Sequence, residues 1–428
     1  MRPDARVLLY GAGREAKSTR RYLAETRPEV AVDVCVDLGD ADIPDTTQIP
    51  AASLPAAFRA GRYAVVIRSA GVSIYKPELE AAKAAGVHIG TNVNMWAGHR
   101  RGAAKVIAIT GTKGKSTTAK LTHEMLTASG LDAGLGGNIG VPPLDLAPHA
   151  IVVLELSSYQ IADIALSPDL IGITTLYPEH LDWHRSQERY FADKLHILDM
   201  AGDWSVALGP QAATHPAFAA KRVAAKRLLP SLPPDFEEDI TDAVRASRLR
   251  GTHNLDNAIL AARLALATGA NEAGILAAIK IFQPLPHRLQ EFELAGIRFV
   301  DDSIATTPEA TKAALAAYPL GRLALIAGGH DRGQDYADLA SRLDRSNVSL
   351  VAALPATGPR LVAAIRALDL PIDLVEAETL ESAMRQLSDR RARFDTLLLS
   401  PGAPSFGQFR DFEERGDKFA EYARHYFR

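Results

Sequence analysis

A glycine-rich loop between a predicted strand and a predicted helix carries the clearest chemical signal in this sequence. The apolar run VIAIT (106–110) leads into TGTKGKST (110–117), and a helix-forming stretch follows. Glycines let backbone N–H groups converge on phosphate oxygens, and the helix N-terminus adds partial positive charge. Lys115 is placed to neutralise the β- and γ-phosphates, and the hydroxyl of Ser116 or Thr117 can bind Mg²⁺. An isoleucine replaces the first glycine of the eight-residue phosphate-loop pattern, but the strand-loop-helix context favours ATP binding over a plain surface loop.

Two motifs downstream place polar groups near predicted strands. GGNIG (136–140) is a turn in which the Asn138 amide can both donate and accept hydrogen bonds. ELSSYQ (155–160) follows the apolar run IVVL, so Glu155 lies at the sheet edge where α/β proteins bind ligands. Glu155 is a candidate Mg²⁺ ligand, and a helix-capping carboxylate is the alternative.

The segment YPEHLDWH (177–184) gathers a glutamate, an aspartate and two histidines. Zinc is one interpretation, but H-x₃-H without cysteines gives it little support. The His180 imidazole can instead join oxygen ligands around Mg²⁺ or contact phosphate. Lys194 follows Tyr190 by one helical turn and shares its helix face, although alone it would be read as a solvated surface lysine.

Later segments supply groups suited to a nucleotide. GTHNLDN (251–257) precedes a predicted helix over residues 255–268, and Asn254 and Asn257 share one face, which suits hydrogen bonds to a planar ring such as adenine. Arg288 is a candidate phosphate clamp. Three loops bearing glycine, serine or aspartate also follow predicted strands, which predicts one binding face. These loops span residues 301–308, 327–333 and 399–406.

The first glycine motif, GAGREA (11–16), fits the dinucleotide fingerprint G-x-G-x-x-A, and Asp37 ends the next predicted strand. NAD is one interpretation, a purely structural turn is another, and a nucleotide diphosphate is the favoured one. The turn requires only close approach of the backbone to an anion. An NAD-binding site would not explain why the chain also has an ATP-binding loop.

Length and composition place these motifs in a multidomain globular protein. The 428 residues suggest about three domains, and 47% hydrophobic with 23% charged residues is ordinary for such proteins. The net charge of −3 gives no reason to expect nucleic acid or a membrane surface as partner. Cys35, the single cysteine, excludes an internal disulfide, and no apolar stretch approaches the ~18 residues of a membrane span. The expected location is the cytoplasm.

Short apolar runs alternate with helical segments, which predicts an α/β fold with parallel sheets. Three successive α/β domains are expected, over residues 1–97, 98–284 and 285–428. The predicted strands are 6–10, 30–36, 63–67, 87–89, 106–109, 151–154, 170–174, 297–300, 323–327, 348–352 and 396–399. Predicted helices cover residues 15–25 and begin near 117 and 186; residues 98–102 are the expected linker, and residues 228–235 a turn-rich insertion.

In their order along the chain, these motifs resemble the Mur ligases, most closely the branch that adds glutamate to UDP-N-acetylmuramoyl-L-alanine. The resemblance covers nearly the whole chain and rests on GAGREA, SAGVS, TGTKGKST, GGNIG, ELSSYQ, YPEHLDWH, YFADK, GTHNLDN, LPHR, DDSIATTP, AGGHDRG and LLSPGAPSFGQF. It implies a Rossmann-like UDP-binding domain, a P-loop ATPase-like central domain and a Rossmann-like C-terminal domain. It also implies ATP and Mg²⁺ as cofactors. A monomer is expected.

The resemblance assigns roles to individual residues. ATP would contact Gly111, Thr112, Lys113, Gly114, Lys115, Ser116, Thr117, Asn254, Asn257, Arg288 and Asp302. One Mg²⁺ would lie at Ser116 and Glu155, and a second at His180 and a carbamylated Lys194, in which a cation has become a carboxylate-like ligand. The UDP-sugar would contact Gly13, Gly71, Ser73, Asn138 and His180, and glutamate would contact Ser157, Thr306, Arg332, Ser405 and Phe412. The implied catalytic residues are Lys115, His180 and Lys194.

Three positions depart from the pattern of enzymes that add D-glutamate. Those enzymes have lysines where this chain has Ile304 and Arg332, and an aspartate where it has Gly407. The substituted set resembles the less common branch that adds L-glutamate, and Arg332 suits a side-chain carboxylate as a bidentate clamp. L-Glutamate is therefore the expected substrate, with D-glutamate the alternative.

The implied chemistry is activation of a carboxylate by phosphoryl transfer. The alanyl carboxylate attacks the γ-phosphate of ATP, and the glutamate amine then displaces phosphate from the acyl phosphate. Charge accumulates on oxygen in both steps, so the site needs Mg²⁺, Lys115 and positioning more than a strong base. Two rival classes stay open: a folylpolyglutamate-synthase-like ligase, which would lack the domain of residues 1–97, and an ATP-dependent binding protein without a ligase product.

Overall fold

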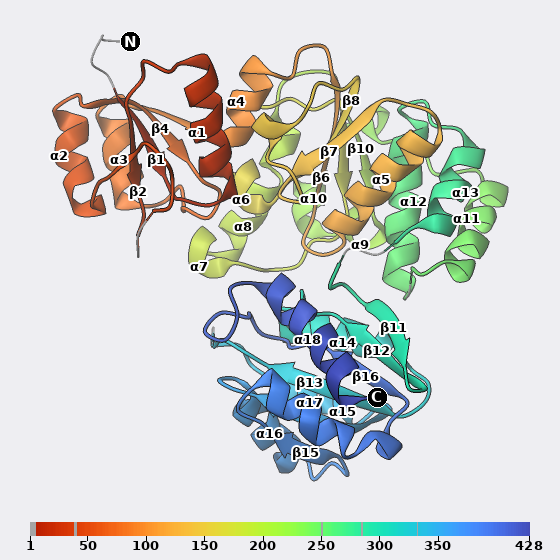
Figure 1. Ribbon diagram of the computed structural model, residues 1–428. Coiled ribbons are helices and arrows are strands. Elements are labelled where there is room, and N and C mark those ends of the chain that lie inside the picture. Colours follow the sequence, from red (N-terminus) through yellow and green to blue (C-terminus); the bar gives the residue numbers. More distant parts are fainter. Residues whose placement is uncertain (1–5, 38–40, 250, 284–285, 332) are drawn as a thin grey trace. The chain divides into compact units, whose positions relative to one another are not determined.

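The computed structural model describes residues 6–37, 41–249, 251–283, 286–331 and 333–428. These residues form three sheets flanked by helices (Figure 1), which confirms the predicted α/β fold. The chain divides into two compact units, one of residues 1–247 and 252–282 and the other of residues 248–251 and 283–428. The first unit contains two of the sheets, and the boundaries predicted near residues 97 and 284 remain predictions.

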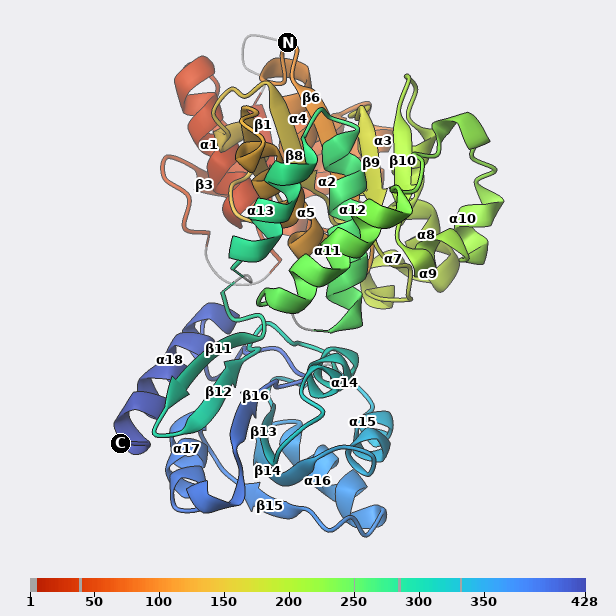
Figure 2. The same cartoon turned by 90° about the vertical axis from the view of Figure 1, so that its right-hand side faces the viewer.

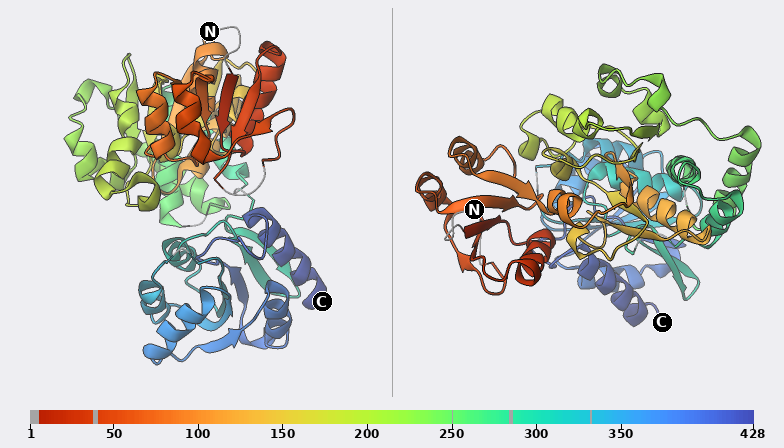
Figure 3. Two further views of the ribbon diagram at one scale, coloured as in Figure 1. Left: turned by 90° about the vertical axis from the view of Figure 1, so that its left-hand side faces the viewer. Right: turned by 90° about the horizontal axis from the view of Figure 1, so that it is seen from above.

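The first sheet is entirely parallel, with the strand order β3-β2-β1-β4-β5. Its strands are β1 (Arg6–Tyr10), β2 (Val32–Cys35), β3 (Thr47–Gln48), β4 (Tyr63–Arg68) and β5 (His88–Thr91). Helix α1 (Arg14–Thr26) packs Ala16 and Leu23 against one face, and α2 (Leu54–Arg59) and α3 (Pro77–Ala84) cover the other (Figure 3). The chain order reverses between β1 and β4, and ligands of such sheets bind at that point.

The second sheet, also parallel, has the order β10-β9-β6-β8-β7. Its strands are β6 (Lys105–Thr110), β7 (Ala133–Gly137), β8 (Ile151–Glu155), β9 (Leu170–Ile173) and β10 (Ser205–Leu208). One face packs on α4 (Asn92–His99), α6 (Ser158–Ile161) and α8 (Gln187–Lys194). The remaining helices of this part are α5 (Lys115–Ala128), α7 (Leu181–His184), α9 (Pro210–Ala213), α10 (Pro216–Ala220), α11 (Pro234–Ala246), α12 (Thr252–Leu266) and α13 (Glu272–Ile281). Because β6 lies between β8 and β9, the loops that follow these three strands are neighbours.

The third sheet forms the second unit, with the order β11-β12-β16-β13-β14-β15 (Figure 2). Its strands are β11 (Gln290–Leu294), β12 (Ile297–Asp301), β13 (Leu323–Gly328), β14 (Val348–Leu354), β15 (Asp373–Glu376) and β16 (Thr396–Leu399), and β11 is antiparallel to β12. One face carries α17 (Leu380–Ser388) and α18 (Phe412–Tyr426). The other carries α14 (Pro308–Ala317), α15 (Ala337–Leu343) and α16 (Gly358–Ala367).

The structure corrects several predicted elements. The strand expected over residues 30–36 is only β2, and the helix expected over residues 255–268 is α12, which starts and ends earlier. The expected linker 98–102 begins inside α4, and the insertion 228–235 ends inside α11. Strands β3, β7, β10, β11 and β15 were not predicted. Among the described residues, none of the helices combines the length and apolar character needed to cross a membrane.

Candidate active site

The phosphate loop joins the end of β6 to α5, and its shape depends on two glycines. Gly111 and Gly114 have φ angles of 137° and 88°, a region that only glycine enters easily. A Cβ at position 111 would lie 2.0 Å from Thr174 Oγ1, and one at position 114 would lie 2.3 Å from Asn257 Oδ1. The loop therefore packs its backbone directly on its neighbours, and both positions require glycine.

Two lysines of this loop have different surroundings. Lys115 begins α5, and its Nζ donates a hydrogen bond to the Thr112 carbonyl at 2.9 Å. Lys113 Nζ instead pairs with Glu179 Oε1 at 2.6 Å. Desolvation opposes ionisation of Glu179, but Lys113 and His180 together hold the pKa of this carboxyl below its usual value. The segment after β9 is thus tied electrostatically to the loop after β6.

Glu155 ends β8 beside the phosphate loop and is 1% exposed. Its Oε1 accepts a hydrogen bond from Asn138 Nδ2 at 3.0 Å, and the Asn138 backbone N–H donates to the Glu155 carbonyl at 2.8 Å. Its Oε2 is buried and has no hydrogen-bond partner. An unpaired buried acceptor costs about 1–3 kcal/mol, a cost that a bound cation would remove.

His180 precedes α7 in a left-handed backbone conformation, with φ of 57°. Its side chain is 40% exposed and its ring centroid lies 4.9 Å from that of Tyr159. Desolvation lowers the pKa of the imidazole to about 4; Glu179 opposes this shift, whereas Lys115 and Lys194 reinforce it. At neutral pH the ring is therefore uncharged and has a lone pair for a metal ion or a proton.

Lys194 ends α8 and is 2% exposed. Its Nζ donates a hydrogen bond to the Gly111 carbonyl at 2.6 Å and lies 5.0 Å from the ring centroid of Tyr190, whose hydroxyl is 2.8 Å from Thr112 Oγ1. Desolvation, reinforced by the charge of Lys115, lowers the pKa of the Lys194 amine well below its usual value. A surface lysine is thus excluded, and the amine is favoured in its neutral, nucleophilic form.

These residues fit Mg²⁺ once Lys194 has been carbamylated. Mg²⁺ prefers oxygen ligands, and Glu155 Oε2 is a carboxylate oxygen that accepts no hydrogen bond. The bare amine of Lys194 offers no oxygen, whereas a carbamate would offer two beside the neutral ring of His180. Among the described residues, no three or more His, Cys, Asp and Glu side chains are grouped so that they could hold a metal ion. The predicted ligand set therefore depends on the carbamate and the Ser116 hydroxyl.

Asn254 and Asn257 lie on α12 and are both buried. Asn257 Nδ2 donates to Asn254 Oδ1 at 3.1 Å, and Thr118 Oγ1 donates to Asn257 Oδ1 at 3.3 Å. Asn257 also lies directly against Gly114 and so supports the phosphate loop. The structure therefore brings this pair to the phosphate loop, whatever it contacts in the nucleotide.

The glycine turn of the first sheet lies at the point where the chain order reverses. Gly13 caps α1, and the Glu15 carboxylate accepts a hydrogen bond from Ala70 N at 2.9 Å. The turn after β1 is thereby joined to the turn after β4, which contains Gly71. Arg14 donates to the carbonyl of Asn138 at 3.3 Å. Three residues predicted to contact the UDP-sugar, one from each segment, are therefore neighbours.

Two predicted contact residues already have structural partners. Ser73 Oγ donates to the Trp183 carbonyl at 2.8 Å, which fastens its turn to α7. Ser157 caps α6 together with Gln160, and Gln160 Nε2 donates to Glu15 at 2.7 Å. The Ser157 hydroxyl therefore holds a helix end, and its predicted role toward glutamate remains a prediction.

In the second unit, Asp302 follows β12 and its Oδ2 accepts a hydrogen bond from Ser400 Oγ at 2.8 Å. Burial raises the pKa of Asp302 to about 7, although Ser400 and Arg288 oppose the shift. Arg288 Nε is buried without a hydrogen-bond partner. His287 Nδ1 lies 2.7 Å from Asp301 Oδ2, and this hydrogen bond raises the pKa of the imidazole. This cluster therefore holds a buried donor, Arg288 Nε, that a bound ligand could satisfy.

Arg415 was missed by sequence reasoning, because it stands among charged residues in a segment that reads as a surface helix. It is 1% exposed and donates to Ser303 Oγ at 2.9 Å, to the Ser303 carbonyl at 2.7 Å and to the Ala403 carbonyl at 3.1 Å. Desolvation lowers the pKa of its guanidinium to about 10. Arg415 thus joins the loops after β12 and β16, and the binding role predicted for these loops remains a prediction.

Of the residues predicted to contact glutamate, Thr306 and Ser405 lie in these loops, and Phe412 begins α18. Thr306 follows β12, and its carbonyl accepts a hydrogen bond from Gln334 Nε2 at 3.0 Å. Ser405 is buried after β16, and the Phe412 carbonyl accepts a hydrogen bond from Ser303 Oγ at 2.8 Å. Arg332 lies outside the described residues.

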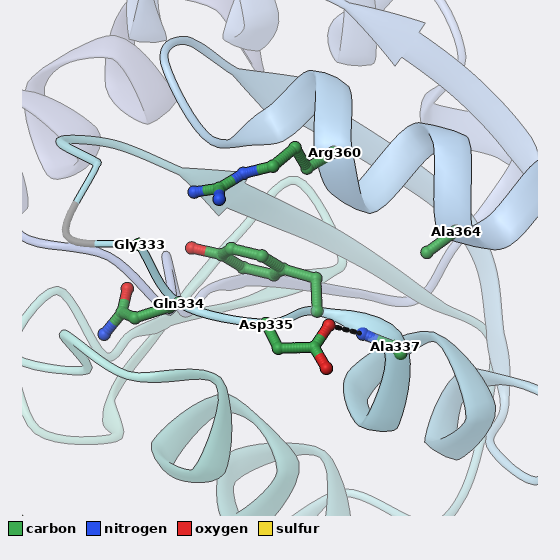
Figure 4. Close-up of a pocket in the computed structure, with 7 residues that line it drawn as sticks. Gly333, Gln334, Asp335, Ala337, Arg360 and Ala364 are labelled. Carbon is green, nitrogen blue, oxygen red and sulfur yellow. Dashed lines mark hydrogen bonds between the residues drawn. The ribbon is translucent and has the colours of Figure 1, made fainter.

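A hollow of about 300 Å³ opens beside this face (Figure 4). The Arg360 guanidinium lies 5.7 Å from the ring centroid of Tyr336, whose hydroxyl donates to the Gly402 carbonyl at 3.0 Å. The residues that line the hollow are Gly333, Gln334, Asp335, Tyr336, Ala337, Arg360 and Ala364. The hollow therefore extends the face formed by the loops after β12, β13 and β16.

Two family models match the chain. The Mur ligase middle domain matches residues 109–227, and the Mur ligase glutamate ligase domain matches residues 287–403. The first match contains the phosphate loop, Glu155, His180 and Lys194. The second contains Arg288, Asp302 and the loop of Thr306.

Full-length relatives extend the similarity to the N-terminal sheet. A UDP-N-acetylmuramoyl-L-alanine–L-glutamate ligase of Xanthomonas axonopodis pv. citri is 37% identical, over 97% of this chain and 94% of its own. The enzyme of the same name from a Micromonospora species is 36% identical, over 98% and 96%. The UDP-N-acetylmuramate–alanine ligase of Thermotoga maritima has the same fold, with a TM-score of 0.60 at 18% identity over 98% of this chain and 99% of its own.

Proposed function

Because this chain belongs to the Mur ligase family, we propose that it joins L-glutamate to UDP-N-acetylmuramoyl-L-alanine at the expense of ATP, in peptidoglycan precursor synthesis. The observation that carries the proposal is the convergence of Lys115, Glu155, His180 and Lys194 on one phosphate loop, at the carboxyl ends of β6, β8 and β9. The full-length relatives carry the same activity in their names.

The first step is phosphoryl transfer to the alanyl carboxylate. The backbone N–H groups of the loop and the Lys115 ammonium would hold the β- and γ-phosphates while the carboxylate oxygen attacks the γ-phosphorus and ADP leaves. Two Mg²⁺ ions, one held by Ser116 and Glu155 and the other by His180 with the carbamate, would neutralise the charge on the transferring group. The buried, unpaired Oε2 of Glu155 supports this placement.

The second step is attack of the glutamate amine on the acyl phosphate, with loss of phosphate. The amine must first lose a proton, and the neutral imidazole of His180 is the candidate base. A ring nitrogen that binds a metal ion cannot accept that proton, so base and ligand are alternative roles for one nitrogen. Glutamate itself would lie at Thr306, Arg332, Ser405 and Phe412.

Carbamylation of Lys194 follows from its surroundings. Desolvation increases the fraction of the amine that is neutral, and the lone pair of the neutral amine attacks CO₂ to give a carbamate and a released proton. The product is an anion, which the charges of Lys115 and Lys113 favour and those of Glu179 and Glu155 oppose. The same cations disfavour the lysine ammonium, so this electrostatic preference supports the modification.

We predict that L-glutamate is the better substrate, with kcat/KM at least ~10-fold above that of D-glutamate. This ratio requires only about 1.4 kcal/mol of differential transition-state binding. The motivation is the joint replacement at Ile304, Arg332 and Gly407, together with the L-glutamate relatives. Arg332→Lys should cost more activity than a conservative exchange suggests, since a fork that fixes a carboxylate in two directions is lost.

The test is product formation followed by chromatography and mass spectrometry, with each enantiomer supplied separately with ATP, Mg²⁺ and the UDP-sugar. Faster product formation from D-glutamate would refute the stereochemical claim and leave the ligase assignment intact.

We also predict that the glycine turn at Gly13 binds the UDP-sugar and not NAD. A ligand at one hundred times its Kd stabilises the folded protein by about 2.7 kcal/mol. UDP-N-acetylmuramoyl-L-alanine should therefore raise the melting temperature in a thermal-shift assay, whereas NAD and NADP should not. Stabilisation by NAD, with none from the UDP-sugar, would reverse the interpretation of this turn.

The proposed partners are small molecules, because no basic surface is indicated by the net charge of −3. All proposed site residues belong to one chain, and we expect a monomer. ATP and a nucleotide-linked sugar are metabolites of the cytoplasm, which is the proposed location.

A further inference from the structure

A network of hydrogen bonds includes Asp193, the residue that precedes Lys194 on α8. Ser158 Oγ is 2.9 Å from His184 Nε2, and His184 Nδ1 is 2.6 Å from Asp193 Oδ2. The Tyr75 hydroxyl donates to both oxygens of Asp193, at 2.9 and 3.0 Å. Ser158, His184 and Asp193 are 3%, 0% and 8% exposed. Three buried polar side chains from separate segments are thus paired with one another, and the half-buried Tyr75 adds a fourth.

Donors and acceptors match along this chain when His184 is neutral with its proton on Nδ1. Nδ1–H then donates to Asp193, and Nε2 accepts from the Ser158 hydroxyl. Burial and the hydrogen bond to Asp193 raise the pKa of the Tyr75 hydroxyl to about 12, so it remains a donor at neutral pH. Each of the four groups then has a hydrogen-bond partner, and a fully satisfied polar network of this kind rigidifies its surroundings.

Ser158, His184 and Asp193 are hydrogen-bonded in the same order as the Ser-His-Asp triad of a serine hydrolase, but the serine is not accessible to a substrate. A nucleophile must reach its substrate, and Ser158 is 3% exposed, with its hydroxyl engaged by His184. The chain is therefore a structural connection, and the question is what it positions.

The chain ends at the proposed metal ligands. Asp193 precedes Lys194 on α8, and the backbone N–H of His184 donates to the His180 carbonyl at 3.1 Å. Trp183, the neighbour of His184, donates through Nε1 to the Gly71 carbonyl at 3.2 Å. The hydrogen bond between His184 and Asp193 thus joins α7 to α8. Tyr75, which follows the predicted sugar-binding turn after β4, binds Asp193 and so connects these helices to the first sheet.

We propose that Tyr75, Asp193, His184 and Ser158 form a positioning chain that aims Lys194 and His180 at the phosphate loop and links them to the N-terminal sheet. The inference rests on the proposed metal-binding role of Lys194. Partners that orient metal ligands typically contribute 10- to 100-fold to metal affinity. Losing one hydrogen bond of this chain should therefore weaken metal binding without changing any ligand.

The experiment compares two tyrosine-to-phenylalanine variants in the full chain. Tyr75→Phe removes the donor to Asp193 and keeps the ring between Arg185 and Arg189. Tyr63→Phe is the matched control, because its buried hydroxyl donates to Asp33 at 2.7 Å in the first sheet, away from Lys194. Mn²⁺ binding is measured by electron paramagnetic resonance with a non-hydrolysable ATP analogue and bicarbonate, and melting temperature is measured alongside.

Tyr75→Phe should weaken Mn²⁺ binding by about 10-fold. Tyr63→Phe should leave the Mn²⁺ affinity at the wild-type value and change only the melting temperature. Ser158→Ala, at the far end of the chain, should act in the same direction as Tyr75→Phe and serves if that variant fails to fold.

Wild-type Mn²⁺ affinity in both Tyr75→Phe and Ser158→Ala would overturn the positioning chain, as would equal weakening by Tyr63→Phe. The Lys194→Ala variant distinguishes a failure of the positioning proposal from a failure of the proposed function. If Lys194→Ala binds Mn²⁺ as wild type does, the metal-binding role of Lys194 is wrong and the inference falls with it.

Discussion

Lys115→Ala should lower the rate of ligation by a factor on the order of 10² or more, as expected when a charge that stabilises a transferring phosphoryl group is lost. The Lys115 ammonium lies over the loop carbonyl of Thr112 at the start of α5, and no other described lysine occupies that position. The loss should appear in kcat, because the developing charge on the γ-phosphate is greatest in the transition state.

The matched control is Lys105→Ala, at the start of β6, the strand that leads into the phosphate loop. Lys105 Nζ donates an exposed hydrogen bond to the Ala267 carbonyl at 3.2 Å, and its loss should affect neither ATP turnover nor the KM for ATP. Wild-type-like turnover in Lys115→Ala would remove the assignment of this loop to phosphate transfer.

Lys194→Ala should be nearly inactive, also by a factor on the order of 10² or more, since the group lost would help to neutralise the transferring phosphoryl group. Activity should return in part when formate or acetate is supplied, because a small carboxylate can occupy the cavity and replace the carbamate oxygens. The buried position of Lys194 beside the Gly111 carbonyl provides such a cavity once the side chain is removed. Nuclear magnetic resonance with ¹³C-labelled bicarbonate should show a carbamate carbon on the wild type.

Lys115→Ala is the control for this rescue, because the group it lacks is a cation that formate cannot replace. An active, Mg²⁺-saturated wild type without a carbamate signal would contradict the modification. Rescue of both variants to the same extent would show that the acid acts elsewhere.

The sequence predicted most central strands, because parallel strands buried on both faces read as apolar β-branched runs. β6, β8 and β13 are of this kind. β7 was missed because its sequence, AGLGG, has weak strand propensity, and it is held by pairing with β8. β11 was missed because it is an edge strand, QEFEL, in which three of the five residues are polar. Tertiary pairing, and not local propensity, creates these two strands.

The site was predictable where function is concentrated in loops after strands. The phosphate loop, Glu155 and His180 fall at neighbouring strand ends, as the motif positions indicated. The partners of these residues were not predictable, since they are distant in the chain. Arg415 binds the Ser303 loop and Tyr75 binds Asp193, and neither pair leaves a periodic signal in the sequence. The burial of Lys194 likewise follows from the packing of α8 on the second sheet.

The central claim, coupling of ATP cleavage to peptide-bond formation, is tested most directly by ADP release from the wild-type protein. With ATP and Mg²⁺ present, rapid and sustained ADP release should require UDP-N-acetylmuramoyl-L-alanine and L-glutamate together, and each alone should give little. ADP release of equal rate without either substrate, or with NAD in place of the UDP-sugar, would contradict the ligase assignment.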